Sequence, residues 1–190
     1  MDQELLLSHL VATLERVKIP YAISGSHAVM AYGEPRHAHD IDVVVELTAA
    51  SAAQLSIAFP PEDYCTRDTK AAVAQGGMFN IIHPDSGQKI DFFVPSDDFE
   101  RGEIARAWRV PVSIGEIVSF VSPEDVIIMK MRYYEMGESD KHLRDSASIL
   151  QKLGDKVNRG YITEQAKSFG LESIWAMIEK RADNPGESRG

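Results

Sequence analysis

Two aspartates one residue apart, Asp40 and Asp42, open the apolar run "DIDVVVEL" at 40–47. Alternate side chains of a strand share a face, so we expect both carboxylates to point the same way. Carboxylates held this close repel each other unless a cation lies between them. A hard divalent ion such as Mg²⁺ takes oxygen ligands of this kind. The pair therefore predicts a metal site at the start of a buried strand.

A third acid, Asp91, stands within a second apolar run, "KIDFFV" at 89–94. An ionised carboxylate in apolar surroundings is costly unless it is paired or shared. We therefore expect Asp91 to join Asp40 and Asp42 in one carboxylate cluster on a sheet. The alternative is that these acids only cap elements and form structural ion pairs.

A glycine and a serine, Gly25 and Ser26, follow the strand-like run "YAIS". Glycine lets the backbone turn and approach a ligand closely. Ser26 is expected at the N-cap of the next helix, where free N–H groups and the helix dipole favour anions. An anion site beside a metal cluster would suit a nucleoside triphosphate (NTP), which predicts an NTP substrate.

Taken together, the Gly-Ser pair, the Asp-x-Asp and the later lone aspartate resemble the polymerase-beta-type nucleotidyltransferase superfamily. The sequence is most similar to its small bacterial abortive-infection and toxin-type members. The resemblance covers residues 20–47, 89–93 and 122–150. It departs from the family pattern before the first acid, where Ala38 takes a position that often carries threonine.

The resemblance implies an α/β (α+β) fold with a mixed, twisted sheet flanked by helices, plus a C-terminal helical part. It implies that Asp40, Asp42 and Asp91 bind Mg²⁺ or Mn²⁺, as two ions, and that Asp91 helps to deprotonate the acceptor. Gly25 and Ser26 would contact the β- and γ-phosphates. The implied reaction is attack of a hydroxyl on the α-phosphate, with release of pyrophosphate.

Three further residues are candidates for nucleotide binding. Arg36 could pair with phosphate or with a nearby acid. Lys130 lies among apolar neighbours, so it either extends to water or contacts phosphate. Toxin-type relatives place a functional lysine in this helix and an aspartate in the next, an order that Lys130 and Asp145 match. Asp145 could equally belong to a solvated charged face.

A zinc site is a competing interpretation of the loop before the first acid, because His37 and His39 stand close to Asp40 and Asp42. A strand extended back to these histidines would point them away from the aspartates. Roles as polar loop residues or substrate contacts are therefore favoured over zinc.

Composition limits the partners and the compartment. With 29 acids against 20 bases, the net charge is -9 at pH 7, which argues against a large non-specific DNA-binding face. The sequence lacks a long apolar run and the pattern of a signal peptide, so no membrane association is expected. A single cysteine, Cys65, excludes an internal disulfide and favours a cytoplasmic location.

The expected organisation is a nucleotidyltransferase core over 1–121, a helical region over 122–184 and a disordered tail over 185–190. Helices are expected at 3–17 and 96–108, the second capped by Ser96. The turn "PDSGQ" predicts a hairpin between two strands. Ser122 followed by Pro123 predicts the start of the first helix of the C-terminal region.

The sequence therefore predicts an enzyme that transfers a nucleoside monophosphate (NMP) from an NTP to a hydroxyl. The acceptor is left open between tRNA, a protein and a small molecule. By analogy with toxin-type relatives, an antitoxin partner and a role in phage defence are further predictions. The alternative is a catalytically silent protein that keeps the fold and binds a nucleotide or a partner.

Overall fold

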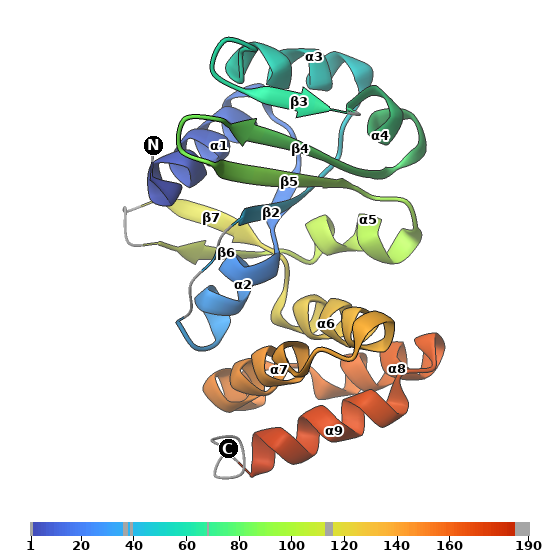
Figure 1. Cartoon of the computed structure of the whole chain (residues 1–190). Coiled ribbons are helices and arrows are strands. Elements are labelled where there is room, and N and C mark those ends of the chain that lie inside the picture. Colours follow the sequence, from blue (N-terminus) through green and yellow to red (C-terminus); the bar gives the residue numbers. More distant parts are fainter. Residues whose placement is uncertain (1, 36–37, 39, 68, 113–115, 185–190) are drawn as a thin grey trace. The chain divides into compact units, whose positions relative to one another are not determined.

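A computed structural model describes residues 2–35, 38, 40–67, 69–112 and 116–184 (Figure 1). Arg36, His37, His39 and the predicted tail at 185–190 lie outside the described residues. The helices and strands of the described residues are, in chain order, α1 (Gln3–Val17), β1 (Tyr21–Ile23), α2 (Gly25–Tyr32), β2 (Asp40–Val45), α3 (Ala49–Ala58), β3 (Cys65–Arg67), α4 (Thr69–Gln75), β4 (Gly77–His83), β5 (Gln88–Val94), α5 (Asp98–Ala105), β6 (Trp108–Pro111), β7 (Ile117–Phe120), α6 (Pro123–Gly137), α7 (Asp140–Leu153), η1 (Gly154–Lys156), α8 (Arg159–Phe169) and α9 (Glu172–Asp183).

The chain divides into two compact units. The first comprises residues 1–27 and 37–121, and the second comprises 28–36 and 122–190. The segment 28–36 therefore belongs to the second unit, although the sequence placed it in the core. A long-range contact explains this, because Lys152 donates a hydrogen bond to the Gly33 carbonyl at 2.8 Å.

The first unit is built on one mixed sheet with the strand order β3-β4-β5-β2-β1-β7-β6. β2 runs parallel to β5 and β1 runs parallel to β7, while the other neighbours are antiparallel. Helix α4 contacts β4, and α5 contacts β1 and β2. This mixed α/β architecture, followed by C-terminal helices, confirms the predicted fold class.

The core of the first unit buries one face of β2, and the two aspartates lie on the other face. Ile41, Val43 and Val45 alternate with the two aspartates and are fully buried. Phe92 of β5 is also fully buried and stacks on Phe79 of β4, with ring centroids 4.7 Å apart. Burying each such side chain contributes roughly 1.5–3 kcal/mol. This packing fixes the face on which Asp40 and Asp42 project.

Several predicted boundaries are set by local capping. The N–H of Leu5 donates to the Asp2 carboxylate at 2.8 Å, which starts α1. Thr48 and Ser51 form a reciprocal capping box at the start of α3. The hairpin of β4 and β5 is also observed. Local polar groups thus determine where these elements begin.

Two expectations for the first unit were wrong in detail. Helix α5 is capped by Asp97 rather than Ser96, because Asp97 accepts the Glu100 N–H at 2.8 Å. Ser96 instead donates its N–H and its hydroxyl to the Glu100 carboxylate. The short strand β3 was not predicted, since its three residues show no periodic pattern and are held by pairing with β4.

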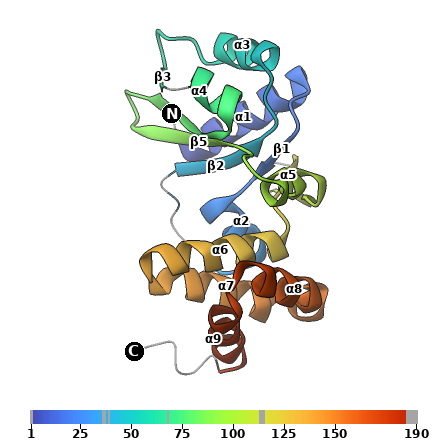
Figure 2. The same cartoon turned by 90° about the vertical axis from the view of Figure 1, so that its right-hand side faces the viewer.

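The second unit is helical, with packing between α6 and α7, α7 and α9, α6 and α8, and α8 and α9 (Figure 2). Ser122 caps α6 and Pro123 occupies its first turn, as predicted. Its core contains the fully buried Ile127, Ile128 and Ile162. Among the described residues, no helix has both the length and the apolar character needed to cross a membrane.

Candidate active site

The register between β2 and β5 brings the three predicted acids together. Asp42 lies directly opposite Asp91, and Asp40 lies opposite Lys89. Residues paired across neighbouring strands project to the same face, and the strands are about 4.8 Å apart. The carboxylates of Asp40, Asp42 and Asp91 therefore share one face of the sheet.

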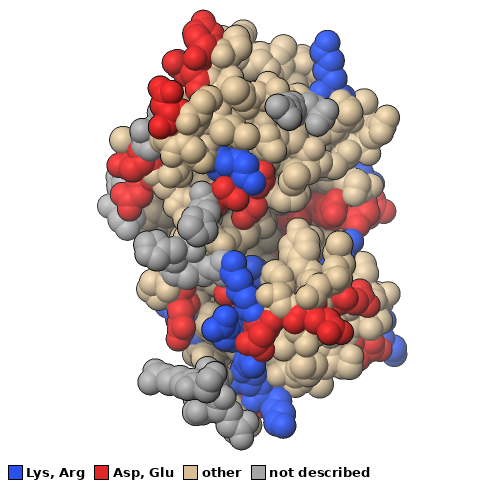
Figure 3. All heavy atoms as spheres, viewed as in Figure 1, with Lys and Arg blue, Asp and Glu red and all other residues tan. Residues whose placement is uncertain are grey.

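A lysine that sequence reasoning missed completes this cluster. The Lys89 ammonium lies 3.1 Å from Asp40 Oδ2 and 2.8 Å from Asp91 Oδ2. In the space-filling view, basic atoms lie against acidic atoms over β2 and β5 (Figure 3). Lys89 precedes Asp91 by two residues, so strand alternation alone could have placed it on the acidic face.

The electrostatics of the cluster follow from these contacts. The hydrogen bond to Asp91 raises the pKa of Lys89 above its ordinary value. Partial burial opposes that rise, and the hydrogen bond to Asp40 adds to it. Lys89 is therefore held as a cation between two carboxylates on different strands.

Asp91 is the most enclosed of the three acids, with only 7% of the residue exposed. Its Oδ1 atom is buried and accepts no hydrogen bond from the described residues. A buried acceptor without a donor costs about 1–3 kcal/mol. This oxygen is therefore the part of the Asp91 carboxylate that the contact from Lys89 to Oδ2 does not satisfy. By contrast, the Asp40 side chain is 39% exposed, so the cluster runs from solvent to the interior.

Gly25 packs directly against the acids. Its φ is 57°, in the left-handed region, and a Cβ at this position would overlap the Asp42 carboxylate. The N–H of Ser24 donates to the Asp42 carbonyl at 2.8 Å, which ties this turn to β2. Only glycine fits here without displacing Asp42.

Ser26 lies in the first turn of α2 and not at its N-cap, because the helix already begins at Gly25. The prediction that Ser26 is the N-cap of this helix was therefore wrong. The first N–H groups of any helix lack intrahelical partners. Gly25 and Ser26 thus still contribute such groups beside Asp42.

Lys130 and Asp145 belong to the second unit and pair with each other. Lys130 Nζ lies 2.9 Å from Asp145 Oδ2, and the two residues are only 7% and 8% exposed. Lys130 therefore does not extend to water, and Asp145 is not on a solvated face. The pair links α6 to α7 within the helical unit.

The donor set of the acid cluster suits Mg²⁺ better than zinc. The oxygens that it could offer a metal are carboxylate oxygens, including a buried one that accepts no hydrogen bond from the described residues. Within the described residues, no group of three His, Cys, Asp or Glu is arranged to hold a metal as the side chains stand. The Lys89 ammonium lies between two of the acids instead. His37 and His39 lie outside the described residues, so the zinc site stays the disfavoured alternative that it was from the sequence.

Two cavities of the first unit lie apart from this cluster. One of about 370 Å³ is lined by residues including Glu46, Ser96 and Arg101. Another of about 760 Å³ lies between α3 and α4, with Ala53 and Lys70 in its wall. Neither is lined by Asp40, Asp42 or Asp91.

Comparison with known proteins identifies the fold. No family model and no curated protein sequence matches this chain. The solved structure of the antibiotic-resistance factor ANT(2'')-Ia is similar, with 17% identity over 96% of this chain and 97% of that chain and a TM-score of 0.63. The lincosamide antibiotic adenylyltransferase LnuA, bound to lincomycin, has 12% identity over 78% and 96% of the two chains and a TM-score of 0.54.

A nucleotidyltransferase-like protein from Paracoccidioides brasiliensis is similar too, with 19% identity over 92% and 90% of the chains and a TM-score of 0.54. This protein therefore has the nucleotidyltransferase fold, which confirms that expectation from the sequence.

Proposed function

We propose that this protein is a metal-dependent nucleotidyltransferase that moves an NMP from an NTP to a hydroxyl acceptor. The observation that carries the proposal is the register that sets Asp42 beside Asp91, with Asp40 on the same face. The buried Oδ1 of Asp91 supports it, because this atom accepts no hydrogen bond from the described residues and a bound cation would give it a partner.

In this proposal Asp40, Asp42 and Asp91 would hold Mg²⁺ or Mn²⁺, as two ions, which would neutralise phosphate charge and activate the hydroxyl. The acceptor hydroxyl oxygen forms a bond to the α-phosphorus while the bond from that phosphorus to the pyrophosphate oxygen breaks. The proton of the hydroxyl passes to Asp91, whose Oδ1 is unpartnered. Gly25 and Ser26 offer N–H groups to the phosphates that leave.

The acceptor that we propose is a small cationic molecule carrying hydroxyl groups. ANT(2'')-Ia has been solved with adenylyl-2''-tobramycin, and LnuA has been solved with lincomycin. The net charge of -9 would attract such a cation. In the second unit, Lys130 is held in a buried pair with Asp145, so this base is not held ready for an RNA backbone.

Other expectations about the biology stay predictions. The structural neighbours do not bear on a toxin role or on an antitoxin partner. A cytoplasmic location likewise rests on the single cysteine alone. Nucleotide contacts from Arg36, Lys130 and Asp145 are further proposals, to be tested by NTP affinity in the corresponding variants.

The test is transfer of label from α-labelled NTPs in the presence of Mg²⁺. Separate reactions contain an aminoglycoside, a lincosamide, tRNA or mixed cellular protein, and pyrophosphate release is measured in each. We expect label on a small molecule, with release of pyrophosphate that EDTA abolishes. Label on tRNA or protein would replace the proposed acceptor and keep the reaction class.

Two variants separate the enzyme from a silent binding protein. Asp42→Asn should lower transfer by at least about 100-fold, because it removes a metal-ligating charge. Asp98→Asn is the matched control, since its side chain is fully exposed on α5. NTP binding without any release of pyrophosphate would support the catalytically silent alternative.

A further inference from the structure

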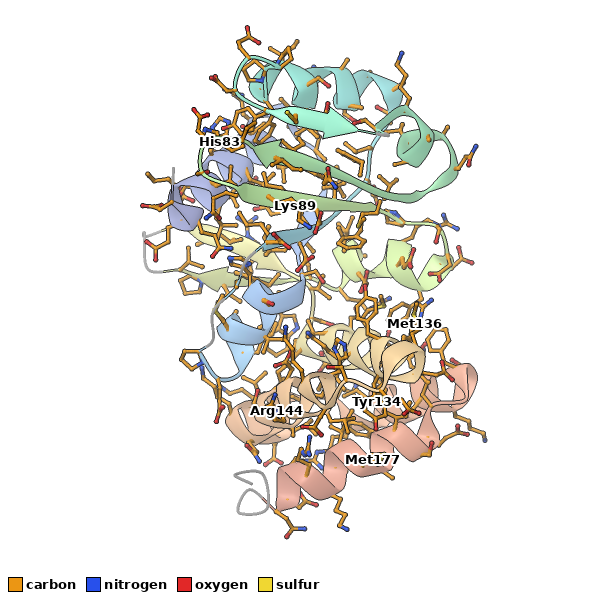
Figure 4. The ribbon with its side chains drawn as sticks, in the orientation of Figure 1. His83, Lys89, Tyr134, Met136, Arg144 and Met177 are labelled. Carbon is orange, nitrogen blue, oxygen red and sulfur yellow. The ribbon has the colours of Figure 1, made fainter. Side chains whose placement is uncertain are left out.

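Lys89 has an unusual position within the candidate site. It stands on β5 (Figure 4). Its ammonium contacts Asp40 of β2 and Asp91 of β5. Both contacts are made to the Oδ2 atoms, at 3.1 Å and 2.8 Å. The lysine therefore joins two of the three carboxylates that would hold a metal ion.

This contact differs from an ordinary surface salt bridge. The Asp91 side chain is only 10% exposed, and the Lys89 side chain is 29% exposed. The nearby pair of Arg101 and Asp98 is typical of the surface, with side-chain exposures of 54% and 101%. Pairs of that kind contribute little, whereas a partly buried ammonium shared by two acids offsets strong mutual repulsion.

A cation at this place is needed for a physical reason. Three carboxylates share one face of adjacent strands, and without a positive charge their repulsion would oppose folding of the sheet. Lys89 supplies a positive charge to two of these carboxylates, those of Asp40 and Asp91. The unpartnered Asp91 Oδ1 marks the part of the cluster that the lysine does not satisfy.

We infer that Lys89 is a built-in counter-ion of the acid cluster, which a divalent cation must displace from Asp40 and Asp91 in order to bind. The inference rests on the proposed function, since it assumes that the cluster binds metal. An ammonium and a divalent ion that contact the same two Oδ2 atoms repel each other strongly at such short range, so the binding of one opposes the binding of the other. The lysine thus stabilises the metal-free protein and lowers its affinity for the metal.

The experiment is calorimetric titration of the full chain with Mn²⁺ in the absence of nucleotide. Lys89→Met should bind Mn²⁺ about tenfold more tightly than the parent protein, because no ammonium competes for the oxygens. Lys89→Gln, which keeps a polar side chain without the charge, should also bind more tightly. Arg101→Met is the matched control and should leave the affinity unchanged, since Arg101 pairs with the exposed Asp98 and not with the acids of the cluster among the described residues.

A second measurement tests whether Lys89 stabilises the metal-free protein. In EDTA, Lys89→Met should melt at a lower temperature than the parent protein, and saturating Mn²⁺ should raise its melting temperature by more. Equal or weaker Mn²⁺ binding by both Lys89 variants, with folding verified by circular dichroism, would overturn the inference.

The outcomes also distinguish this inference from the proposed function. One outcome is that the parent protein binds Mn²⁺ and transfers label while the Lys89 variants bind Mn²⁺ with unchanged affinity. In that case the proposed function stands, and only the inference that the metal displaces Lys89 is wrong. If neither the parent nor the Lys89 variants bind Mn²⁺ at millimolar concentration, the cluster is not a metal site, and both proposals fail.

Discussion

At the scale of single residues, the site depends on close packing between Gly25 and the carboxylate of Asp42. The left-handed φ of Gly25 and the overlap that a Cβ would create act together. Gly87 separates the two effects, because its φ of 69° is similar and, apart from its chain neighbours, no described residue comes within 4 Å of a Cβ placed there.

We predict that Gly25→Ala destabilises the protein by about 2–4 kcal/mol and abolishes transfer, since it adds overlap to backbone strain. Gly87→Ala should cost only about 1 kcal/mol, from strain alone, and should keep activity. Urea denaturation and label transfer measure the two effects. Equal loss of activity in both variants would contradict the role assigned to the contact with Asp42.

Asp91 gives a second prediction at this scale. Asp91→Asn keeps the shape of the side chain but removes the charge that Lys89 contacts at 2.8 Å. We expect label transfer to fall by at least about 100-fold and Mn²⁺ affinity to fall with it. Calorimetry and single-turnover assays measure these effects, and an unchanged Mn²⁺ affinity would exclude Asp91 from the metal site.

At the scale of elements, the buried phenol of Tyr21 in β1 limits the stability of the fold at alkaline pH. Burial raises the pKa of Tyr21 to about 12, and its hydroxyl donates to Glu15 Oε1 at 3.2 Å. The folded state therefore prefers the neutral phenol more strongly than the unfolded chain does, where the pKa is about 10. Burial raises the pKa of Tyr32 as well.

This shift predicts that stability is fully present below about pH 10 and is lost as the pH rises to about 12. Tyr21→Phe should make the unfolding free energy less steep over this window, because Phe cannot ionise. Urea midpoints measured at several alkaline pH values test this. An unchanged slope in Tyr21→Phe would show that other groups, such as Tyr32 and Lys89, account for the effect.

The buried pair of Lys130 and Asp145 joins two helices of the second unit. We predict that Lys130→Met destabilises the protein by about 3 kcal/mol, because it leaves the Asp145 charge buried without its lysine. Arg144→Met should change stability by less than about 0.5 kcal/mol, since its pair with Asp140 is exposed.

Chemical denaturation measures both changes, and a titration of folded Lys130→Met with NTP tests the nucleotide contact separately. A stable Lys130→Met variant with weakened NTP binding would favour the phosphate role over the structural one.

At the scale of the whole molecule, charge bears on the choice of acceptor. The net charge is -9, yet basic side chains gather on the visible face of the second unit (Figure 3). In that unit Arg144 and Arg181 each pair with Asp140. The acidic balance favours a cationic acceptor, and the basic face is the reason for including tRNA in the transfer assay.

For a polycationic acceptor, we predict that kcat/KM falls several-fold between about 50 mM and about 500 mM salt, because added ions screen the attraction. An uncharged hydroxyl acceptor at saturating NTP is the control and should show little change. A rate that does not depend on salt would indicate that the protein charge plays no part in capturing the acceptor.

The sequence by itself determined the features that depend on local rules. Alternation along β2 put Asp40 and Asp42 on one face, Gly25 marked a tight backbone turn, and Ser122 with Pro123 marked the start of α6. These follow from side-chain periodicity and capping over a few residues.

Only the tertiary structure decided which elements became partners. The parallel register of β2 with β5, the place of Lys89 between Asp40 and Asp91, and the membership of 28–36 in the second unit all join residues far apart in the chain. Such pairings depend on burial of the whole sheet and of the helical core, and no local pattern encodes that choice of partner.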